Sequence, residues 1–227
     1  MTKRKLSRFA EIETFANVIQ FACSFPLKTH DLKGKWNELF FKNKNPVVLE
    51  LGCGRGEYTV HLAEKYPQKN FIGIDIKGAR LWRGARTAIE QKMNNVGFVR
   101  TRIEQIECLF EHNEISEIWI TFPDPQPRES REKKRLTSPL FLHRYKNFIS
   151  PNGMIHLKTD NENLFHYTLE IAKQYNLTIN RCLEDLYSLD DLDAVLKVQT
   201  TYEQLFLKQG AKIYYLNFSL VERKSGE

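Results

Sequence analysis

The octapeptide Leu49-Glu50-Leu51-Gly52-Cys53-Gly54-Arg55-Gly56 decides the fold of this chain of 227 residues. The apolar run 47–51 predicts a buried β-strand, and the residues after the last glycine have the pattern of a helix. Glycines at a turn between strand and helix let a ligand approach the backbone N–H groups at the helix N-terminus. The stretch therefore predicts the first turn of an α/β domain with a nucleotide-type ligand crevice.

Short apolar runs alternate with amphipathic stretches along the rest of the chain, a pattern typical of βαβ units. We expect strands at 47–51, 71–75, 96–100, 115–122, 154–158, 177–183 and 212–221. We expect helices at 55–66, 78–93, 103–110, 138–149, 161–174 and 201–208, a long polar loop at 123–137 and a turn at 151–153. The sequence thus predicts a doubly wound α/β fold, with a mostly parallel, seven-stranded Rossmann-like sheet and helices on both faces. This domain would span 46–227, after an N-terminal extension (1–45) that is basic at its start and amphipathic after it.

Composition limits the class of protein further. With 41% hydrophobic and 27% charged residues, the chain can bury a large core, which excludes a disordered or collagen-like protein. The four cysteines lie far apart and form no CxxC pair, and the histidines show no metal-ligand spacing, so we expect reduced thiols and no metal. No secretory signal or membrane span is evident, which predicts a cytoplasmic location. The net charge of +6 permits a polyanionic partner without requiring one.

The ligand of the glycine turn is predicted from the charges beside it. A nicotinamide dinucleotide fingerprint requires GxGxxG, yet Glu57 follows Gly56, and Glu50 would repel a pyrophosphate. S-adenosylmethionine carries a sulfonium and an α-ammonium group, which suit a loop that offers both N–H groups and a carboxylate. Glu50 would face the cationic part, while Gly52 and Gly54 let the loop approach the ligand.

A second carboxylate completes this half of the crevice. Asp75 ends the expected strand 71–75, where it is placed to accept hydrogen bonds from two ribose hydroxyls. A carboxylate at this place selects an unphosphorylated ribose.

The acceptor half is expected at the next strand end, where 118–122 leads into Pro123-Asp124-Pro125. Asp124 occupies the position at which pyrimidine methyltransferases that form a covalent adduct need a thiol, so covalent catalysis is disfavoured. Enzymes that methylate exocyclic amines carry a small polar residue before two prolines and an aromatic ring. That pattern is offset here and lacks the ring, so an exocyclic amine of a nucleic acid remains the alternative acceptor.

A run of cations follows in the loop next to this edge, Arg128-Glu129-Ser130-Arg131-Glu132-Lys133-Lys134-Arg135. Such a run is usually solvated surface, but beside Asp124 it favours contacts with phosphates. Further along, Asp160 ends the expected strand 154–158, and Thr200 with Glu203 opens the last helix. Helix capping and dipole pairing explain Asp160 and Glu203 as well as a ligand does.

Taken together, these segments resemble the tRNA (guanine-N7-)-methyltransferase family from about Val47 to Phe218. The segments that carry the resemblance are Leu49–Gly56, Gly73-Ile74-Asp75, Phe122-Pro123-Asp124-Pro125, Arg131-Glu132-Lys133-Lys134-Arg135-Leu136-Thr137, Lys158-Thr159-Asp160 and Thr200-Thr201-Tyr202-Glu203. Their order and spacing make the match specific.

The resemblance implies an S-adenosylmethionine-dependent enzyme that methylates N7 of a guanine in tRNA, at nucleotide 46 of the variable loop, with S-adenosylhomocysteine as the second product. Glu50 and Asp75 would bind the donor, and Asp124 would be the active-site acid. The guanine pocket would be shaped by Asp160, Thr200 and Glu203, and tRNA would contact Ser130, Arg131, Glu132, Lys133, Lys134 and Arg135.

Three residues depart from the family pattern. Gln126 replaces an aromatic Trp after the second proline. Arg128 stands where the family has a substrate-binding lysine, which keeps the charge but changes its geometry. Arg102 replaces the acid near the adenine, so Arg102, Ile103 or Glu104 would be the neighbour of that ring.

The expected reaction is a direct in-line transfer. The N7 lone pair of guanine carries no proton, so no general base is needed and positioning does most of the work. Positive charge passes to the guanine ring, which a desolvated carboxylate at Asp124 would stabilise in the transition state. A non-catalytic RNA-binding module on the same fold is the second alternative. The oligomeric state, monomer or homodimer, stays open.

Overall fold

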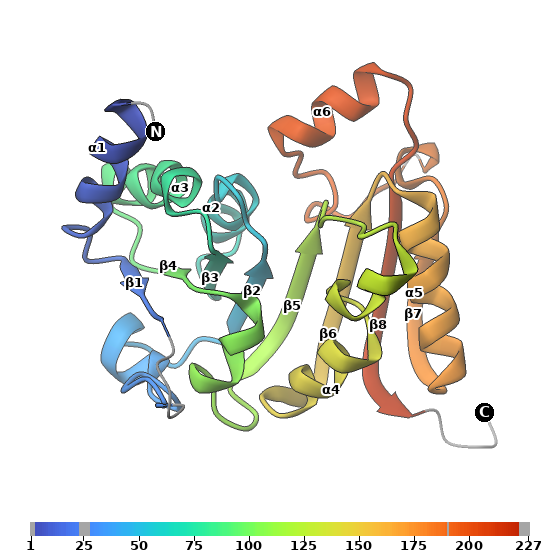
Figure 1. The fold of residues 1–227 in the computed structure, drawn as a ribbon, viewed down its shortest axis with the longest axis horizontal. Helices are drawn as coiled ribbons and strands as arrows, with labels where there is room; N and C mark the ends of the chain where they lie inside the picture. The colour runs from blue at the N-terminus through green and yellow to red at the C-terminus, as the bar shows by residue number, and fades with distance from the viewer. Residues whose placement is uncertain (1–2, 23–27, 190, 223–227) are drawn as a thin grey trace.

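The computed structural model describes residues 3–22, 28–189 and 191–222. Its centre is an eight-stranded sheet with the strand order β1-β4-β3-β2-β5-β6-β8-β7 (Figure 1). The strands are β1 (Val18–Gln20), β2 (Val47–Leu51), β3 (Asn70–Asp75), β4 (Val96–Arg100), β5 (Ile115–Thr121), β6 (Ile149–Thr159), β7 (Leu177–Leu183) and β8 (Tyr214–Glu222). The mostly parallel α/β class predicted from the sequence is confirmed.

The chain direction in the sheet defines where a ligand binds. Strands β1 to β6 pair in parallel, whereas β8 pairs antiparallel with β6 and β7. From β2 the chain builds outward to β3 and β4, and then returns to place β5 on the other side of β2. Open α/β sheets bind ligands at the carboxyl ends of the strands where the order reverses in this way. The boundary between β2 and β5, where Glu50 pairs with Trp119, is that point.

Helices cover both faces of the sheet. The described helices are α1 (Lys3–Ile12), α2 (Glu57–Lys65), α3 (Gly78–Glu90), α4 (Pro139–Lys146), α5 (Glu162–Gln174) and α6 (Thr201–Lys208), with a π-helical turn η1 (Trp36–Phe41) and the 3₁₀ turns η2 (Ile103–Cys108), η3 (Glu129–Lys134) and η4 (Leu186–Ser188). The strand and helix bounds predicted at 47–51, 96–100 and 201–208 agree with β2, β4 and α6.

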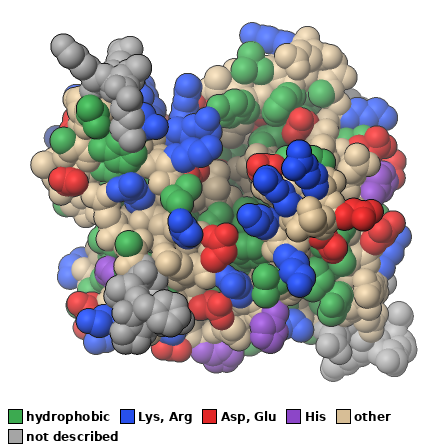
Figure 2. Space-filling view, in the orientation of Figure 1, with side chains coloured by type: hydrophobic (Ala, Val, Ile, Leu, Met, Phe, Trp, Pro, Cys, Tyr) green, Lys and Arg blue, Asp and Glu red, His purple; other side chains and the backbone are tan. Residues whose placement is uncertain are grey.

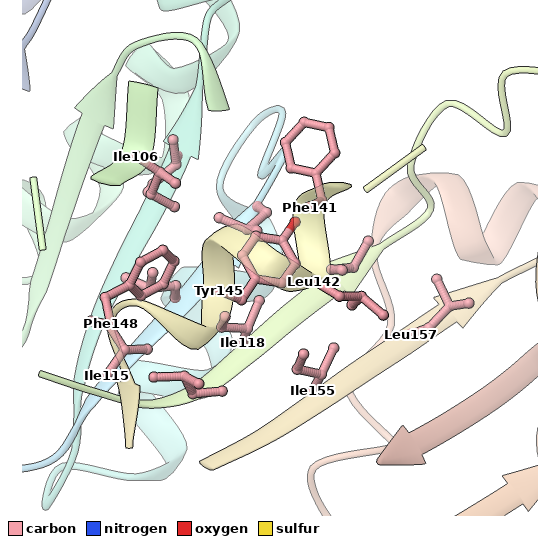
Figure 3. Close-up of a cluster of buried hydrophobic side chains, with 14 of the residues drawn as sticks. Ile106, Ile115, Ile118, Phe141, Leu142, Tyr145, Phe148, Ile155 and Leu157 are labelled. Atoms are coloured by element: carbon pink, nitrogen blue, oxygen red, sulfur yellow. The ribbon is translucent and has the colours of Figure 1, made fainter. Parts of the chain in front are cut away.

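Alternate residues of the central strands build two cores. Val47 and Leu49 of β2 point to the face covered by η1, α4 and α5, whereas Val48 points to the face covered by α2 and α3. This period of two is the geometry of a pleated strand buried on both sides. Figure 3 shows the first core, where Phe141 and Tyr145 of α4 pack with side chains of β5 and β6.

The predicted count of seven strands is wrong, because the chain before residue 46 contributes an eighth. The segment Val18–Gln20 pairs in parallel with Phe98–Arg100 of β4 and extends the sheet at that edge. Three residues are too few to show an alternating pattern, so the sequence gives no signal for this strand. Trp36, farther along the same segment, is fully buried and donates its indole N–H to the Leu109 carbonyl at 2.9 Å.

Two details of the predicted strand and loop regions also differ. The turn expected at 151–153 lies within β6, where the pairing with β5 shifts between Ile115 and Glu117 and leaves extra residues on β6. This irregularity accommodates the Pro-Asn-Gly sequence without ending the strand. The loop expected at 123–137 contains the turn η3, which carries most of the cationic run.

Candidate functional site

A cleft of about 780 Å³ opens at the carboxyl ends of β2, β3 and β5. Figure 2 shows a hollow at the centre of this face. The residues predicted as a site that line the cleft are Glu50, Gly52, Gly54, Asp75, Arg102, Asp124, Lys134, Asp160 and Thr200. The structure therefore brings both predicted halves of the crevice into one cavity, whose size is in the range of roughly 300–1,000 Å³ typical of small-molecule sites.

The glycine turn keeps free the space that a ligand would need. Gly52 and Gly54 have φ values of +76° and +56°, a conformation that favours glycine. A Cβ atom at Gly52 would meet no atom within 4 Å, so packing does not explain this glycine. At Gly56 a Cβ would lie 2.5 Å from the ring of Phe98, so this glycine instead permits close packing of the helix on the sheet. The first two glycines thus have the geometry expected of a ligand cradle.

Asp75 fixes the turn from the neighbouring strand. Its carboxylate accepts hydrogen bonds from the N–H of Gly54 at 2.9 Å and from the N–H of Lys77 at 2.7 Å. Ionised carboxylates accept up to about four hydrogen bonds. Asp75 therefore retains capacity to accept further hydrogen bonds from a ligand.

Glu50 is buried, with 4% of its surface exposed, and lies at the base of the cleft. Its two carboxyl oxygens accept hydrogen bonds from the hydroxyls of Thr59 on α2 and Thr121 on β5, the latter at 2.6 Å. Burial raises the pKa of Glu50 to about 7, and the hydroxyl hydrogen bonds from Thr121 and Thr59 oppose part of that rise. A cation placed above the carboxyl group would favour its ionised form.

Burial also decides the role of Cys53 within the turn. Loss of contact with water raises the pKa of its thiol well above the usual value, so the reactive thiolate is disfavoured. This agrees with the expectation that Cys53 fills space and is not a nucleophile.

Asp124 projects from a constrained loop on the opposite side of the cleft. Phe122 and Gln126 flank it with φ values of +47° and +46°, which are uncommon for residues with a side chain. One oxygen of Asp124 accepts a hydrogen bond from the N–H of Gln126 at 3.0 Å. The side chain is exposed, so the desolvated carboxylate expected from the sequence is not present in this structure. The loop presents the acid to the cleft, and a bound ligand would have to cover it.

Asp160 and Thr200 lie on the same cleft wall with different local roles. The N-terminal cap of α5 is Asn161, whose side chain accepts from the N–H of Leu164 at 2.8 Å, so capping does not account for Asp160. Thr200 caps α6 through a reciprocal capping box with Glu203. Tyr202 and Phe206 of the same helix also line the cleft.

Glu203 does not line the cleft. It is fully buried and forms an ion pair with Lys158 of β6, with 2.7 Å between Oε1 and Nζ. Tyr187 donates its hydroxyl to the same carboxylate at 2.7 Å. Glu203 thus lies on the buried side of α6, where its capping-box contacts fix the position of Thr200.

Lys158 and Glu57 are two positioning residues for which the sequence predicted no role. Lys158 donates to the carbonyls of Leu196 and Val198, both at 3.1 Å, and so fixes the chain that leads into α6. Glu57, the first residue of α2, accepts from the backbone N–H and the hydroxyl of Thr201 at 2.8 and 3.0 Å. A lysine inside an apolar strand is the one signal available in the sequence, because a buried ammonium needs an acid near it.

All three residues predicted as possible neighbours of the adenine ring, Arg102, Ile103 and Glu104, line the cleft. Ile76, which follows Asp75, lines it as well and is half exposed. Ile76 and Ile103 thus add two apolar side chains to this part of the cleft.

The cationic loop borders the cleft through Lys134, whereas Arg128 lies outside the lining. Arg135 stacks over the ring of Tyr167, 4.2 Å from its centre, and donates to the Gln126 carbonyl at 3.3 Å. This arginine anchors the loop to α5. Glu132 is also engaged, because it accepts the hydroxyl of Tyr167 at 2.9 Å. The remaining cations and Ser130 are exposed.

Metal-binding clusters and membrane-spanning helices are both absent from the part of the chain that the structure describes. In the described ranges, no group of three or more His, Cys, Asp or Glu side chains could hold a metal ion. None of the helices in these ranges is long and apolar enough to cross a membrane. Cys23 lies outside the described residues.

Comparison with known proteins defines the class of this fold and site. Residues 44–216 match a family described as putative methyltransferase. The fold is similar to the 16S rRNA methyltransferase KamB, with a TM-score of 0.61 and 13% identity over 84% of this chain and 94% of that one. The chain is therefore an α/β methyltransferase.

Close relatives give the particular family. The chain is 52% identical to the tRNA (guanine-N(7)-)-methyltransferase of Christiangramia forsetii over 96% of this chain and 99% of that protein. It is 48% identical to the enzyme of the same name from Bacteroides fragilis over 97% of this chain and 87% of that protein. The chain belongs to the tRNA (guanine-N(7)-)-methyltransferase family.

Proposed function

We propose that this protein transfers a methyl group from S-adenosylmethionine to N7 of a guanine in tRNA. The observation that carries the proposal is the single cleft in which Glu50 and Asp75 lie on one side and Asp124 and Asp160 on the other. Family membership supports the same activity. Nucleotide 46 of the variable loop is the proposed target, and the cytoplasm stays the predicted location.

The residues at the glycine turn fit the proposed donor. The free space over Gly52 and Gly54 accommodates a ligand lying along the turn, and Asp75 has hydrogen-bonding capacity left for ribose hydroxyls. Glu50 lies beneath and can neutralise a cationic amino-acid part. S-adenosylmethionine, when bound, supplies the electrophilic methyl group.

The acceptor side acts by positioning and by charge. Guanine N7 is nucleophilic without losing a proton, so the protein has to align it and does not have to deprotonate it. As positive charge develops on the ring, the Asp124 carboxylate stabilises it, and the stabilisation grows once the base covers the acid and excludes water. The hydrogen bond from the N–H of Gln126 orients this acid before the substrate arrives.

Selection of guanine follows from acceptor groups on the same wall. Guanine presents N–H donors at N1 and N2, whereas adenine presents a different pattern. A carboxylate such as Asp160 or Asp124 that accepts from these donors would be left unpaired by adenine. Both acids line the cleft, and no side-chain hydrogen bond engages Asp160 within the described chain.

The exposed cations of the η3 loop should carry part of the tRNA affinity. Replacing Lys133 and Lys134 by glutamate is expected to weaken tRNA binding and to flatten its dependence on salt, because phosphate contacts release about 0.9 counterion each. Binding measured at several potassium chloride concentrations tests this. Affinity for S-adenosylmethionine should be unchanged for Lys133→Glu alone, since Lys133 does not line the cleft. An unaltered salt slope would mean that the loop is only solvated surface.

Glu50 predicts a pH dependence for donor binding. With a pKa of about 7, Glu50 is mostly protonated at pH 6 and mostly ionised at pH 7.5, and the cationic donor favours the ionised form. Donor affinity is therefore expected to rise by roughly eightfold between these pH values. The same raised pKa means that the stability of the free protein falls as the pH rises from 4.5 to about 7.

The matched variant for this pH dependence is Glu50→Gln, which removes the titration but keeps hydrogen-bonding groups for both threonines. Its donor affinity should be lower than that of the wild type at pH 7.5 and nearly flat over the range, by isothermal titration calorimetry. A wild-type profile that is equally flat would contradict contact between Glu50 and the donor cation.

The activity itself is tested by incubating the pure protein with labelled S-adenosylmethionine and unmodified tRNA, followed by nucleoside analysis. N7-methylguanosine, confirmed by borohydride-induced cleavage at one nucleotide, is the expected product. A methylated exocyclic amine would support the first alternative, and tRNA binding without any transfer would support the non-catalytic one.

A further inference from the structure

The wall of the cleft opposite the η3 loop carries cations for which the sequence suggested no role. Lys77 precedes α3 and Arg80 lies in its first turn; both side chains are exposed and line the cleft. Arg83 follows one turn later and is exposed as well. Positions three residues apart lie on neighbouring parts of one helix face. Lys77 and Arg80 therefore form one edge of the cavity, and Arg83 continues this edge along α3 outside the lining. These three residues are here named the α3 rim.

No salt bridge joins the α3 rim to an acidic side chain among the described residues. Other arginines of the same region are engaged. Arg86 of α3 pairs with Glu11 at 2.6 Å and with Glu90 at 2.8 Å. Arg100 lies 4.8 Å from the ring centre of Phe9. The α3 rim, in contrast, can bind an external anion without breaking an ion pair.

The two buried charged side chains of the cleft are both acids, whereas its exposed charges are of both signs, with Glu104 and Asp124 among the cations. The acids Glu50 and Asp75 are 4% and 9% exposed and lie at the strand ends. The rim cations and Lys134 are exposed on opposite walls. In Figure 2, Lys and Arg side chains lie on both sides of the hollow. A polyanion would be repelled from the floor and attracted to both walls.

The proposed acceptor atom explains why two walls would be needed. The proposed target lies in the variable loop, and proteins bind bases of RNA loops after these are splayed out of the stack. We expect the guanine to enter the cleft in this way, as other bases do when enzymes modify them. The phosphates before and after the extruded nucleotide then stay outside, one on each side of the opening.

We propose that the α3 rim is a second tRNA-backbone site, which binds phosphates on one side of the extruded guanine while the η3 loop binds those on the other. This inference rests on the proposed function and extends it, because it assigns the substrate strand a path across the cleft. Phosphates are sequence-independent contacts, so the rim positions the RNA and does not read it.

The test compares three variants that each lose three positive charges. The first is Lys77→Gln/Arg80→Gln/Arg83→Gln, the second Arg131→Gln/Lys133→Gln/Lys134→Gln. The control is Lys92→Gln/Lys146→Gln/Lys173→Gln, whose lysines follow or end α3, α4 and α5 at the opposite edge of the sheet. Binding of unmodified tRNA is measured by fluorescence anisotropy at several potassium chloride concentrations.

Loss of three phosphate contacts is expected to lower the salt slope of the α3 rim variant by about 2 to 3 and to weaken binding at least about tenfold. The η3 variant should behave similarly and the control should match the wild type. When the rate is measured over a range of tRNA concentrations, the rim variant should show a raised KM for tRNA with a smaller change in kcat.

A rim variant with the salt slope of the control would overturn the proposal. So would a variant in which only S-adenosylmethionine affinity falls, because Lys77 and Arg80 would then be part of the donor site alone. Nucleoside analysis of the wild-type reaction tests the methyl-transfer activity independently of RNA binding by the rim. A lowered salt slope in the rim variant, together with no N7-methylguanosine from the wild type, would contradict the proposed function but would support the two-sided RNA site.

Discussion

Asp124→Ala is expected to lower the rate of methyl transfer to tRNA on the order of 10²–10³-fold, the size seen when one preorganised electrostatic contact to a transition state is removed. The reason is that Asp124 is the acid that the constrained loop presents to the acceptor side of the cleft. Binding of tRNA should persist, because the cations that bind phosphates are unaltered. Single-turnover rates at saturating tRNA and donor measure the effect.

Two further variants make this prediction specific. Asp124→Asn keeps the size and one acceptor oxygen but removes the charge, so it should lose most of the rate if charge stabilisation is the main effect. Asp31→Ala removes an exposed aspartate outside the cleft and should behave as wild type. Near wild-type turnover in Asp124→Ala would show that Asp124 has no catalytic role.

The central part of the fold can be predicted from the sequence because local patterns determine it. The run 47–51 is apolar except for Glu50 and is buried on both faces, and the glycine turn follows directly, so both the strand and its ligand edge are recognisable. The capping-box pattern of Thr200 and Glu203 likewise predicts the start of α6 from the sequence. These signals depend only on neighbours along the chain.

Long-range pairing accounts for what the sequence did not show. The strand Val18–Gln20 exists because β4 offers it an unpaired edge, which no local pattern reveals. The partner of Glu203 is Lys158, 45 positions earlier by residue number. The sequence near Glu203 therefore shows that this residue can cap α6, but it does not show that the carboxylate is buried against a lysine. The exposure of Asp124 also depends on the backbone of residues 122–126 and not on its neighbours' polarity.

The buried pair of Lys158 and Glu203 leads to the second large effect. Lys158→Met should destabilise the protein by about 3–5 kcal/mol, because it leaves the carboxylate of Glu203 buried without its counter-charge. For a domain of this size, that corresponds to a fall in Tm of roughly 6 to 20 °C. Thermal unfolding followed by circular dichroism measures it. Below the melting transition, KM for tRNA should rise, since Thr200 loses its fixed position at the cleft.

The double variant Lys158→Met/Glu203→Gln separates positioning from direct contact with the base. It removes both charges, while the glutamine oxygen can still accept from the N–H of Thr200 and its NH2 group can donate to the hydroxyl of Tyr187. Removing a buried ion pair as a whole is often close to neutral, so most of the lost stability should return. If Glu203 acts only by holding α6, methyl transfer should return with it. A stable but inactive double variant would show that the charge of Glu203 reaches the guanine after all, which would require α6 to move when tRNA binds.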